Sequence, residues 1–195
     1  MSDRLPRIPF DELDACQREL YDRITGGLRA TSTPHFPLTA HDGTLNGPFG
    51  VMVHGPVLGS ILEQLGTAIR YHTALSPRQR EIAILHVAQA ERSEFEWWAH
   101  TRVGRNVGLT AAELDELSRG DFVGQDDVER ASAAFCRILL GEGNLTDHEF
   151  ANFAAALCPS TMIELTVLVG YYRMLAQLMS VFDIGLPPDA LIDNG

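Results

Sequence analysis

Apolar residues recur every three to four positions along most of the chain, which is the period of an amphipathic helix. Leu13, Cys16, Leu20 and Ile24 show this spacing in the first helix, which ends at the pair Gly26 and Gly27. No stretch keeps the alternation of a strand for long enough to compete. The pattern therefore predicts an all-α fold.

Helix starts are marked by capping boxes, in which a serine or threonine stands three residues before a glutamine or glutamate. Ser76, Thr110 and Thr146 begin such boxes. With glycines and prolines as stop signals, about seven to eight helices are expected. They cover residues 11–26, 56–73, 76–92, 93–106, 110–118, 126–139, 146–157 and 160–183. We expect them to form a single domain over residues 1–195.

The segment between the first two helices, residues 28–49, is rich in proline, glycine and threonine and is predicted to be a long loop. Loops of that length in compact domains are often lids or pocket walls. Phe49, at the end of this loop, is therefore a candidate for contact with a substrate. The alternative is an ordinary surface loop.

Composition narrows the classes of partner. The chain has 195 residues, 45% of them hydrophobic, and a net charge of −11 without a cluster of Lys and Arg, which argues against a nucleic acid partner. Cys16, Cys136 and Cys158 are odd in number and far apart, as expected in a reducing cytoplasm rather than in a disulfide framework. The first residues lack the apolar core of a signal peptide, so a cytoplasmic location is expected.

The longest apolar run, residues 161–182, contains Glu164, Arg173 and Gln177. Polar residues at these positions are typical of a buried or interfacial helix rather than of a membrane span, so we expect no membrane partner. The run has more apolar surface than a peripheral helix needs. We therefore expect a homo-oligomer.

Residues 81–100 hold the candidate chemistry. Ser93 stands three residues before Glu96, and Glu96 stands four before His100, so a helix would place the three on one side. Glu81 would reach them only from a preceding helix that folds back on this one. Because Glu81 heads a nearly all-apolar run, it is expected to be partly buried, and a buried carboxylate needs a partner or a function.

The pair Glu96 and His100 is a candidate general acid or base. The carboxylate would hold the imidazole tautomer and favour the imidazolium near neutral pH. Trp97 and Trp98 would lower the hydration around the pair and strengthen its electrostatics. The alternative is an ordinary helix-surface ion pair, with one tryptophan filling the core or an interface.

Other chemistries fit the sequence less well. A metal set of Glu81, Glu96 and His100, with His54 or His86 added, is conceivable, but no two histidines stand at the i, i+4 spacing of helical metal ligands. No glycine-rich phosphate loop occurs, and no nucleophile elbow surrounds Ser93. We therefore expect neither a metal nor another cofactor.

The order of these residues resembles the carboxymuconolactone decarboxylase family. The likeness rests on Arg80-Glu81-Ile-Ala-Ile-Leu, Phe95-Glu96-Trp97-x-x-His100 and Gly108-Leu109-Thr110. Further fragments that agree are Gly47-Pro48-Phe49, His54-Gly-Pro56, Val169-Gly-Tyr-Tyr172 and Leu186-Pro187-Pro188. The resemblance therefore covers most of the chain, and its motifs are specific in combination.

The resemblance implies a helical bundle of the alkylhydroperoxidase D (AhpD) type, assembled as trimers or hexamers. The peroxidase branch of that superfamily carries a C-x-x-C before the histidine, and here those two positions are Ser93 and Glu96. Without a thiolate pair, peroxide reduction by disulfide exchange is disfavoured. The other branch implied by the resemblance is a cofactor-free decarboxylase of aromatic-compound breakdown, which acts on a lactone bearing a carboxylate.

We therefore predict a carbon–carbon lyase that acts on a small lactone or carboxylic acid. In this hypothesis His100 donates the proton and Glu96 orients it, while Glu81 is a second proton-handling carboxylate and Ser93 donates a hydrogen bond. The candidates for substrate contact are Trp97, His54, Phe49 and Arg80. Two rival interpretations are another acid–base enzyme, such as an isomerase, hydrolase or dehydratase, and a non-catalytic binding or scaffold protein.

Overall fold

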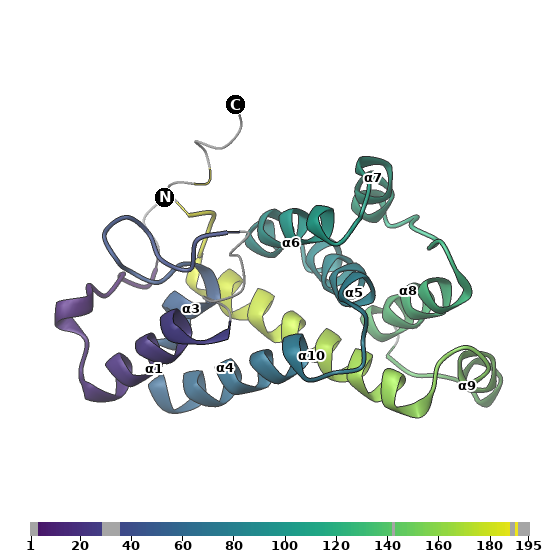
Figure 1. Cartoon of the computed structure of the whole chain (residues 1–195), viewed down its shortest axis with the longest axis horizontal. Coiled ribbons are helices and arrows are strands. Elements are labelled where there is room, and N and C mark those ends of the chain that lie inside the picture. Colours follow the sequence, from purple (N-terminus) through teal and green to yellow (C-terminus); the bar gives the residue numbers. More distant parts are fainter. Residues whose placement is uncertain (1–3, 29–35, 142, 188–189, 191–195) are drawn as a thin grey trace. The chain divides into compact units, whose positions relative to one another are not determined.

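The structure is a computed structural model that describes residues 4–28, 36–141, 143–187 and 190. In this part of the chain the secondary structure is helical, apart from one isolated bridge between Thr39 and Leu45 (Figure 1). The all-α prediction is confirmed. Pro188, which contributed to the family resemblance, lies outside the described residues.

The chain divides into two compact units. The first unit contains Met1–Tyr71 and Leu175–Gly195, and the second unit contains His72–Met174. The candidate chemistry of residues 81–100 lies wholly within the second unit. The expectation of a single domain over the whole chain stays a prediction.

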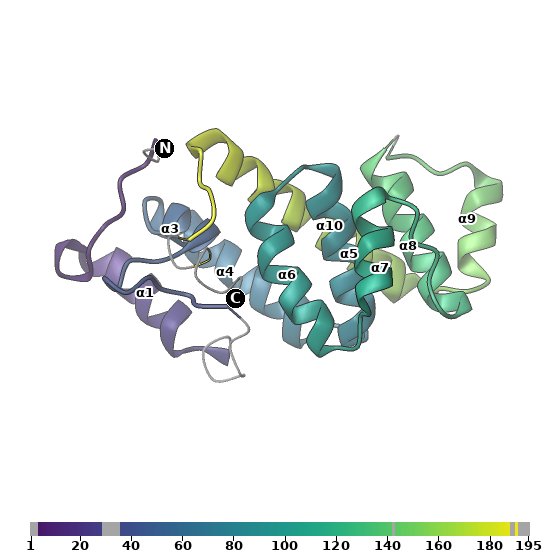
Figure 2. The same ribbon diagram turned by 90° about the horizontal axis from the view of Figure 1, so that it is seen from above.

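The second unit is built around α5 (Pro77–Ala90). This helix packs against α6 (Glu94–Asn106), α7 (Ala111–Arg119) and α8 (Asp127–Leu140) (Figure 2). Every residue from Glu81 to Ala88 is buried, because α5 has neighbours on several sides. The apolar cluster of this unit consists of Ile82, Leu85, Leu109, Leu114, Leu117, Phe122 and Ala133.

Helix α9 (Asp147–Ala154) packs on α8. The rings of Phe153 and Phe135 meet edge to face there, with centroids 5.3 Å apart. The last helix, α10 (Pro159–Phe182), begins in the second unit and ends in the first. The helix is long enough to cross a membrane, and an 18-residue window of it has a mean hydropathy of 1.3, but the core helix of a soluble protein can meet the same two criteria.

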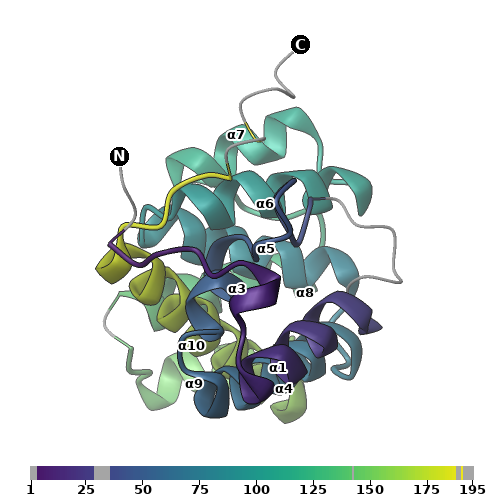
Figure 3. The same ribbon diagram turned by 90° about the vertical axis from the view of Figure 1, so that its left-hand side faces the viewer.

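The first unit contains a short 3-10 helix, η1 (Phe10–Glu12), and the α-helices α1 (Ala15–Gly26), α3 (Gly47–Met52) and α4 (Pro56–Tyr71). Figure 3 shows α1 lying along α4. A Cβ atom at Gly59 of α4 would stand 2.4 Å from the Met52 carbonyl oxygen and 2.8 Å from Leu20. Only a glycine at position 59 therefore allows Met52 and Leu20 to lie this close to the backbone of α4.

The predicted loop over residues 28–49 is wrong at its end, because α3 begins at Gly47. This helix has only six residues, two of them glycine and one proline, so it shows no apolar period. The segment before α3 is fixed by Arg7, which donates hydrogen bonds to Thr44 Oγ1 at 2.7 Å and to Asn46 Oδ1 at 2.7 Å. With α3 included, the described residues form nine α-helices rather than seven to eight.

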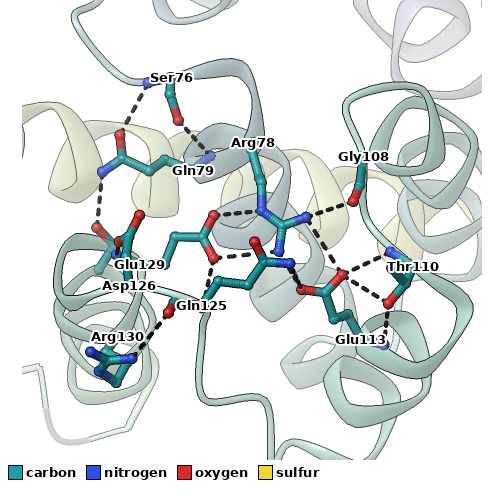
Figure 4. A network of polar contacts seen from close by, with 11 residues as sticks. Ser76, Arg78, Gln79, Gly108, Thr110, Glu113, Gln125, Asp126, Glu129 and Arg130 are labelled. Carbon is teal, nitrogen blue, oxygen red and sulfur yellow. Dashed lines mark hydrogen bonds and ion pairs between the residues drawn. The ribbon is translucent and has the colours of Figure 1, made fainter.

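A network of charged side chains joins three helices of the second unit (Figure 4). The Arg78 guanidinium, in the first turn of α5, donates to Glu129 Oε1 of α8 at 2.5 Å and also to Glu113 of α7. It donates a further bond to the Gly108 carbonyl oxygen at 2.7 Å. The network fixes the start of α5, three residues before Glu81.

Candidate active site

The helices α5 and α6 form a hairpin that positions the candidate residues. Helix α5 ends at Ala90, Arg92 takes the left-handed conformation with φ 54°, and Ser93 caps the start of α6. This short connection turns the chain back on itself, so α6 lies against α5. The fold-back that the sequence required for Glu81 to reach His100 is therefore present.

Three side chains meet in the interior of this hairpin. His100 Nδ1 lies 2.6 Å from Glu81 Oε2, and His100 Nε2 lies 3.2 Å from Glu96 Oε2. The first contact joins two helices, while the second joins residues one turn apart in α6. All three residues are no more than 3% exposed. We call this group the Glu–His–Glu set.

The Glu–His–Glu set favours a charged imidazole. Burial alone would lower the pKa of His100, but the negative charge of Glu81 and the hydrogen bonds to both carboxylates outweigh burial and raise this pKa well above its ordinary value of 6.5. His100 is therefore an imidazolium at neutral pH, and each ring N–H donates to one carboxylate. Two anionic groups thus flank one cation in a site shielded from water.

Two further groups lie beside the set. Arg80 Nε stands 3.8 Å from Glu81 Oε1, so this carboxylate has a cation on each of its oxygens. The ring of Tyr172, from α10, meets the His100 ring edge to face, with centroids 5.2 Å apart and planes at 90°. The contact with Tyr172 was not predicted. Its only trace in the sequence is a pair of tyrosines, Tyr171 and Tyr172, in an apolar run.

Ser93, Trp97 and Trp98, the other candidates of this unit, contact groups other than the His100 ring. Ser93 Oγ accepts a hydrogen bond from the Glu96 backbone N–H at 3.4 Å, which makes it the N-cap of α6. Trp97 is partly buried and packs against the apolar cluster. The Trp98 ring lies under the Arg102 guanidinium, whose central carbon is 4.5 Å from the ring centroid.

Phe49 and His54, the remaining candidates, belong to the first unit. Phe49 is buried in α3. His54 follows α3, and its Nε2 lies 2.8 Å from the Pro6 carbonyl oxygen. These contacts give both residues a place in the packing of the first unit, and their contact with a substrate stays a prediction.

Two cavities lie within single units of the described chain. One, of about 20 Å³, is in the first unit and is lined by residues that include Leu5, Tyr21 and Ile184. The other, a more open hollow of about 420 Å³, is bordered by the segment from Asp121 to Gln125 in the second unit. Neither is lined by the Glu–His–Glu set. In the described part of the chain, no group of three His, Cys, Asp or Glu residues is arranged to hold a metal ion.

The fold is shared with solved structures of low sequence identity. A peroxidase-related protein from Ralstonia eutropha JMP134 with the alkylhydroperoxidase AhpD core aligns with a TM-score of 0.76 and 12% identity, over 97% of this chain and 95% of that one. A variant of the debrominase Bmp8 in complex with 2,3,4-tribromopyrrole aligns with a TM-score of 0.71 and 12% identity, over 98% and 96%. The chain therefore has the fold of the AhpD core.

Sequence comparison finds a family similarity over part of the chain. Residues 56–149 match the profile of the carboxymuconolactone decarboxylase family, and this range contains the whole Glu–His–Glu set. This match over residues 56–149 and the shared fold agree with the resemblance carried by the motifs of residues 80–110. No curated protein matches this chain in sequence.

Proposed function

We propose that this chain is an enzyme that transfers a proton to or from carbon in a small organic substrate, without a cofactor. The observation that carries the proposal is the buried imidazole of His100 between the carboxylates of Glu81 and Glu96. Titratable groups that are buried and strongly perturbed by a specific charge partner cluster at active sites. The match to the carboxymuconolactone decarboxylase family over residues 56–149 and the shared fold support an enzyme of this general type.

The charges of the Glu–His–Glu set and Arg80 cancel at rest, and this arrangement is suited to stabilising an anionic intermediate. Glu81 and Glu96 carry two negative charges, and His100 and Arg80 carry two positive ones, so the resting group is neutral. When a carbon acid loses a proton, or a carboxylic acid loses CO₂, the electron pair stays on the substrate as an enolate. A buried imidazolium nearby stabilises that charge, because few water molecules screen the interaction.

Within this class, decarboxylation of a lactone acid is the reaction that the family favours. The bond to the carboxylate carbon breaks, CO₂ leaves, and the bonding electrons move into the conjugated carbonyl of the lactone. A proton that the Glu–His–Glu set takes up from water and passes to the carbanion then forms the new C–H bond. This reaction needs an electron sink in the substrate and a positioned acid in the protein, and it requires no metal or redox partner.

Thiol peroxidase activity is disfavoured. Ser93 and Glu96 stand where the peroxidase branch has its two cysteines, and neither side chain can form a disulfide. Burial raises the pKa of the Cys136 thiol to about 12. Hydrogen bonds from Ser160 and Thr161 lower the pKa of the exposed Cys158 to about 7, but a single thiol does not replace a dithiol.

The test is incubation with a carboxymuconolactone while CO₂ release is measured. The wild-type protein should release CO₂, and His100→Ala should lower turnover by roughly 10²–10⁴-fold, since the set loses its central group. His72→Ala, at an exposed histidine of the same unit, is the matched control and should behave as wild type.

The rival interpretations give different results. An isomerase, hydrolase or dehydratase would consume the lactone without CO₂, and its product would show which bond had changed. A binding or scaffold protein would leave the lactone unchanged in both the wild type and the variant. Equal CO₂ release by His100→Ala and the wild type would remove the proposed role of the set.

A further inference from the structure

Both ring nitrogens of His100 are already engaged. Nδ1 bonds to Glu81 at 2.6 Å and Nε2 bonds to Glu96 at 3.2 Å. An imidazolium has two N–H donors, one on each ring nitrogen, and these two contacts use both. The ring can therefore offer a proton to a substrate only by first breaking a charged hydrogen bond inside the protein.

The two carboxylates differ in what their second oxygens contact. Glu81 Oε1 faces the Arg80 guanidinium, while Glu81 Oε2 faces His100. Glu96 Oε2 also faces His100, but Glu96 Oε1 is buried and has no hydrogen-bond partner among the described residues. A buried carboxylate oxygen without a donor is unfavourable in a resting protein, so its persistence calls for an external donor.

We propose that Glu96, through Oε1, is the catalytic residue that exchanges a proton with the substrate, and that His100 is a positioning residue behind it. This inference rests on the proposed function, and it reverses the roles that the sequence predicted for these two residues. Glu81 then binds the Nδ1 side of the imidazolium, opposite Glu96, and Arg80 in turn contacts Glu81. The imidazolium in turn fixes the orientation of the Glu96 carboxylate.

The same geometry defines the chemical class of the substrate at the reacting position. An ionised oxygen that lacks a donor binds a hydrogen-bond donor or an acidic C–H, and it repels another carboxylate. The group that meets Glu96 Oε1 is therefore an enolisable carbon or a hydroxyl beside a carbonyl. If the substrate also carries a carboxylate, that group lies away from Oε1.

The proton transfer is balanced without a co-reactant. A C–H bond next to a carbonyl breaks, its electron pair forms the enolate, and the proton bonds to Glu96 Oε1. The reverse step returns the proton to carbon. His100 keeps both of its protons throughout, so the cation remains in place while the substrate is anionic.

Deuterium exchange into a neutral carbon acid tests this assignment. α-Angelica lactone in D₂O is the probe, and incorporation at the carbon beside its carbonyl is followed by NMR. Glu96→Gln keeps the size of the side chain but removes the base, and exchange should fall by roughly 10²–10⁴-fold. Glu94→Gln, at an exposed glutamate of the same helix, is the matched control and should exchange as wild type.

Chemical rescue separates a catalytic role from a structural one. Added formate should restore exchange in Glu96→Ala, because a small carboxylate can occupy the vacated position, and it should not restore exchange in His100→Ala. If Glu96→Gln stays within roughly ten-fold of wild type while His100→Ala loses exchange, the imidazole acts directly on the substrate. The inference would then be wrong, although the proposed function would stand.

A wild-type protein that neither exchanges deuterium into the probe nor releases CO₂ from a carboxymuconolactone would instead overturn the proposed function, and this inference with it. Failure of formate to restore Glu96→Ala, in a variant that keeps the wild-type unfolding temperature, would also contradict the assignment of Glu96.

Discussion

His100 and His86 are both buried histidines of the second unit, but their surroundings favour opposite charges. His100 lies between two carboxylates, which raise its pKa. His86 lies in the middle of α5 with its ring edge to face against Phe122, at a centroid distance of 6.2 Å. Its Nε2 has no hydrogen-bond partner in the described part of the chain. Burial, with a smaller contribution from the positive charge of Arg137, lowers the pKa of His86 to about 4.

His86 should therefore make stability sensitive to acid. Because its folded pKa lies below the unfolded value of 6.5, folding loses stability as the pH falls from 6.5 towards 4, by roughly 3 kcal/mol in total. His86→Leu removes this loss. Urea unfolding at several pH values should show a shallower acid dependence for the variant than for wild type, with His72→Ala as the control. Parallel curves for wild type and His86→Leu would contradict the assignment.

At the scale of single residues, the sequence predicts contacts between residues that are close together on one helix. The contact between Glu96 and His100 follows from a spacing of four residues on a helix. Ser93 stands three residues before Glu96, and this spacing fits both an N-cap and a place beside the candidate catalytic residues. Because α6 begins at Glu94, Ser93 is its N-cap. The edge of Tyr172 against His100 joins separate helices, so no local pattern indicates it.

Helices with strong start signals were predicted within a few residues of their observed bounds. Ser76, Thr110 and Thr146 each form the expected capping box, and Ser93 divides residues 76–106 into two helices as expected. Helix α3 was missed, because Gly47 and Pro48 are typical of turns. The network around Arg78 was also missed, since ion pairs between helices leave no periodic pattern.

The Arg78 network should be important for the stability of the second unit. The side chains of Arg78, Glu113 and Glu129 are 16%, 12% and 8% exposed, so removing the cation leaves two carboxylates largely buried and unpaired. Arg78→Ala should therefore cost about 3 kcal/mol or more of the free energy of unfolding. Arg119→Ala, which breaks the exposed ion pairs with Asp115 and Asp121, is the control and should have a much smaller effect.

Urea denaturation of both variants checks this expectation, and similar losses for the two would contradict it. Although burial opposes it, the contact with Arg78 and the hydrogen bonds from Thr110 together lower the pKa of Glu113 from 4.5 to about 2. The stabilisation from this pair is therefore present above 4.5 and is lost as the pH falls towards 2. In Arg78→Ala this part of the acid dependence should be weaker.

At the scale of the whole molecule, the family match over residues 56–149 and the AhpD-type fold agree with the resemblance in the sequence, while assembly into trimers or hexamers stays a prediction. The exposed surface of α4 is a candidate for the interface between subunits. Val57, Leu58 and Ile61 are 74%, 70% and 57% exposed on this helix. Adjacent large apolar side chains with this exposure are typical of a protein interface, and we propose a second copy of the chain as the partner.

Light scattering at micromolar concentration tests the assembly. The wild type should be an oligomer, and Ile61→Glu should shift it towards monomer, because the new carboxylate would be buried in the interface. Gln64→Glu adds the same charge at an exposed polar position of α4 and should leave the oligomer intact. A monomeric wild type would contradict the prediction, and an oligomer unaffected by Ile61→Glu would exclude α4 as the interface.

The charge state of His100 tests the central claim most directly. Nitrogen-15 NMR of the histidine rings can follow His100 during a pH titration of wild type, Glu81→Gln and His100→Ala, with the last variant identifying the signal. The Glu–His–Glu set predicts that in the wild type both ring nitrogens carry protons at neutral pH and that the pKa lies well above 6.5, and that Glu81→Gln lowers this pKa. A wild-type His100 that titrates at or below 6.5, or whose pKa is unchanged in Glu81→Gln, would contradict the account.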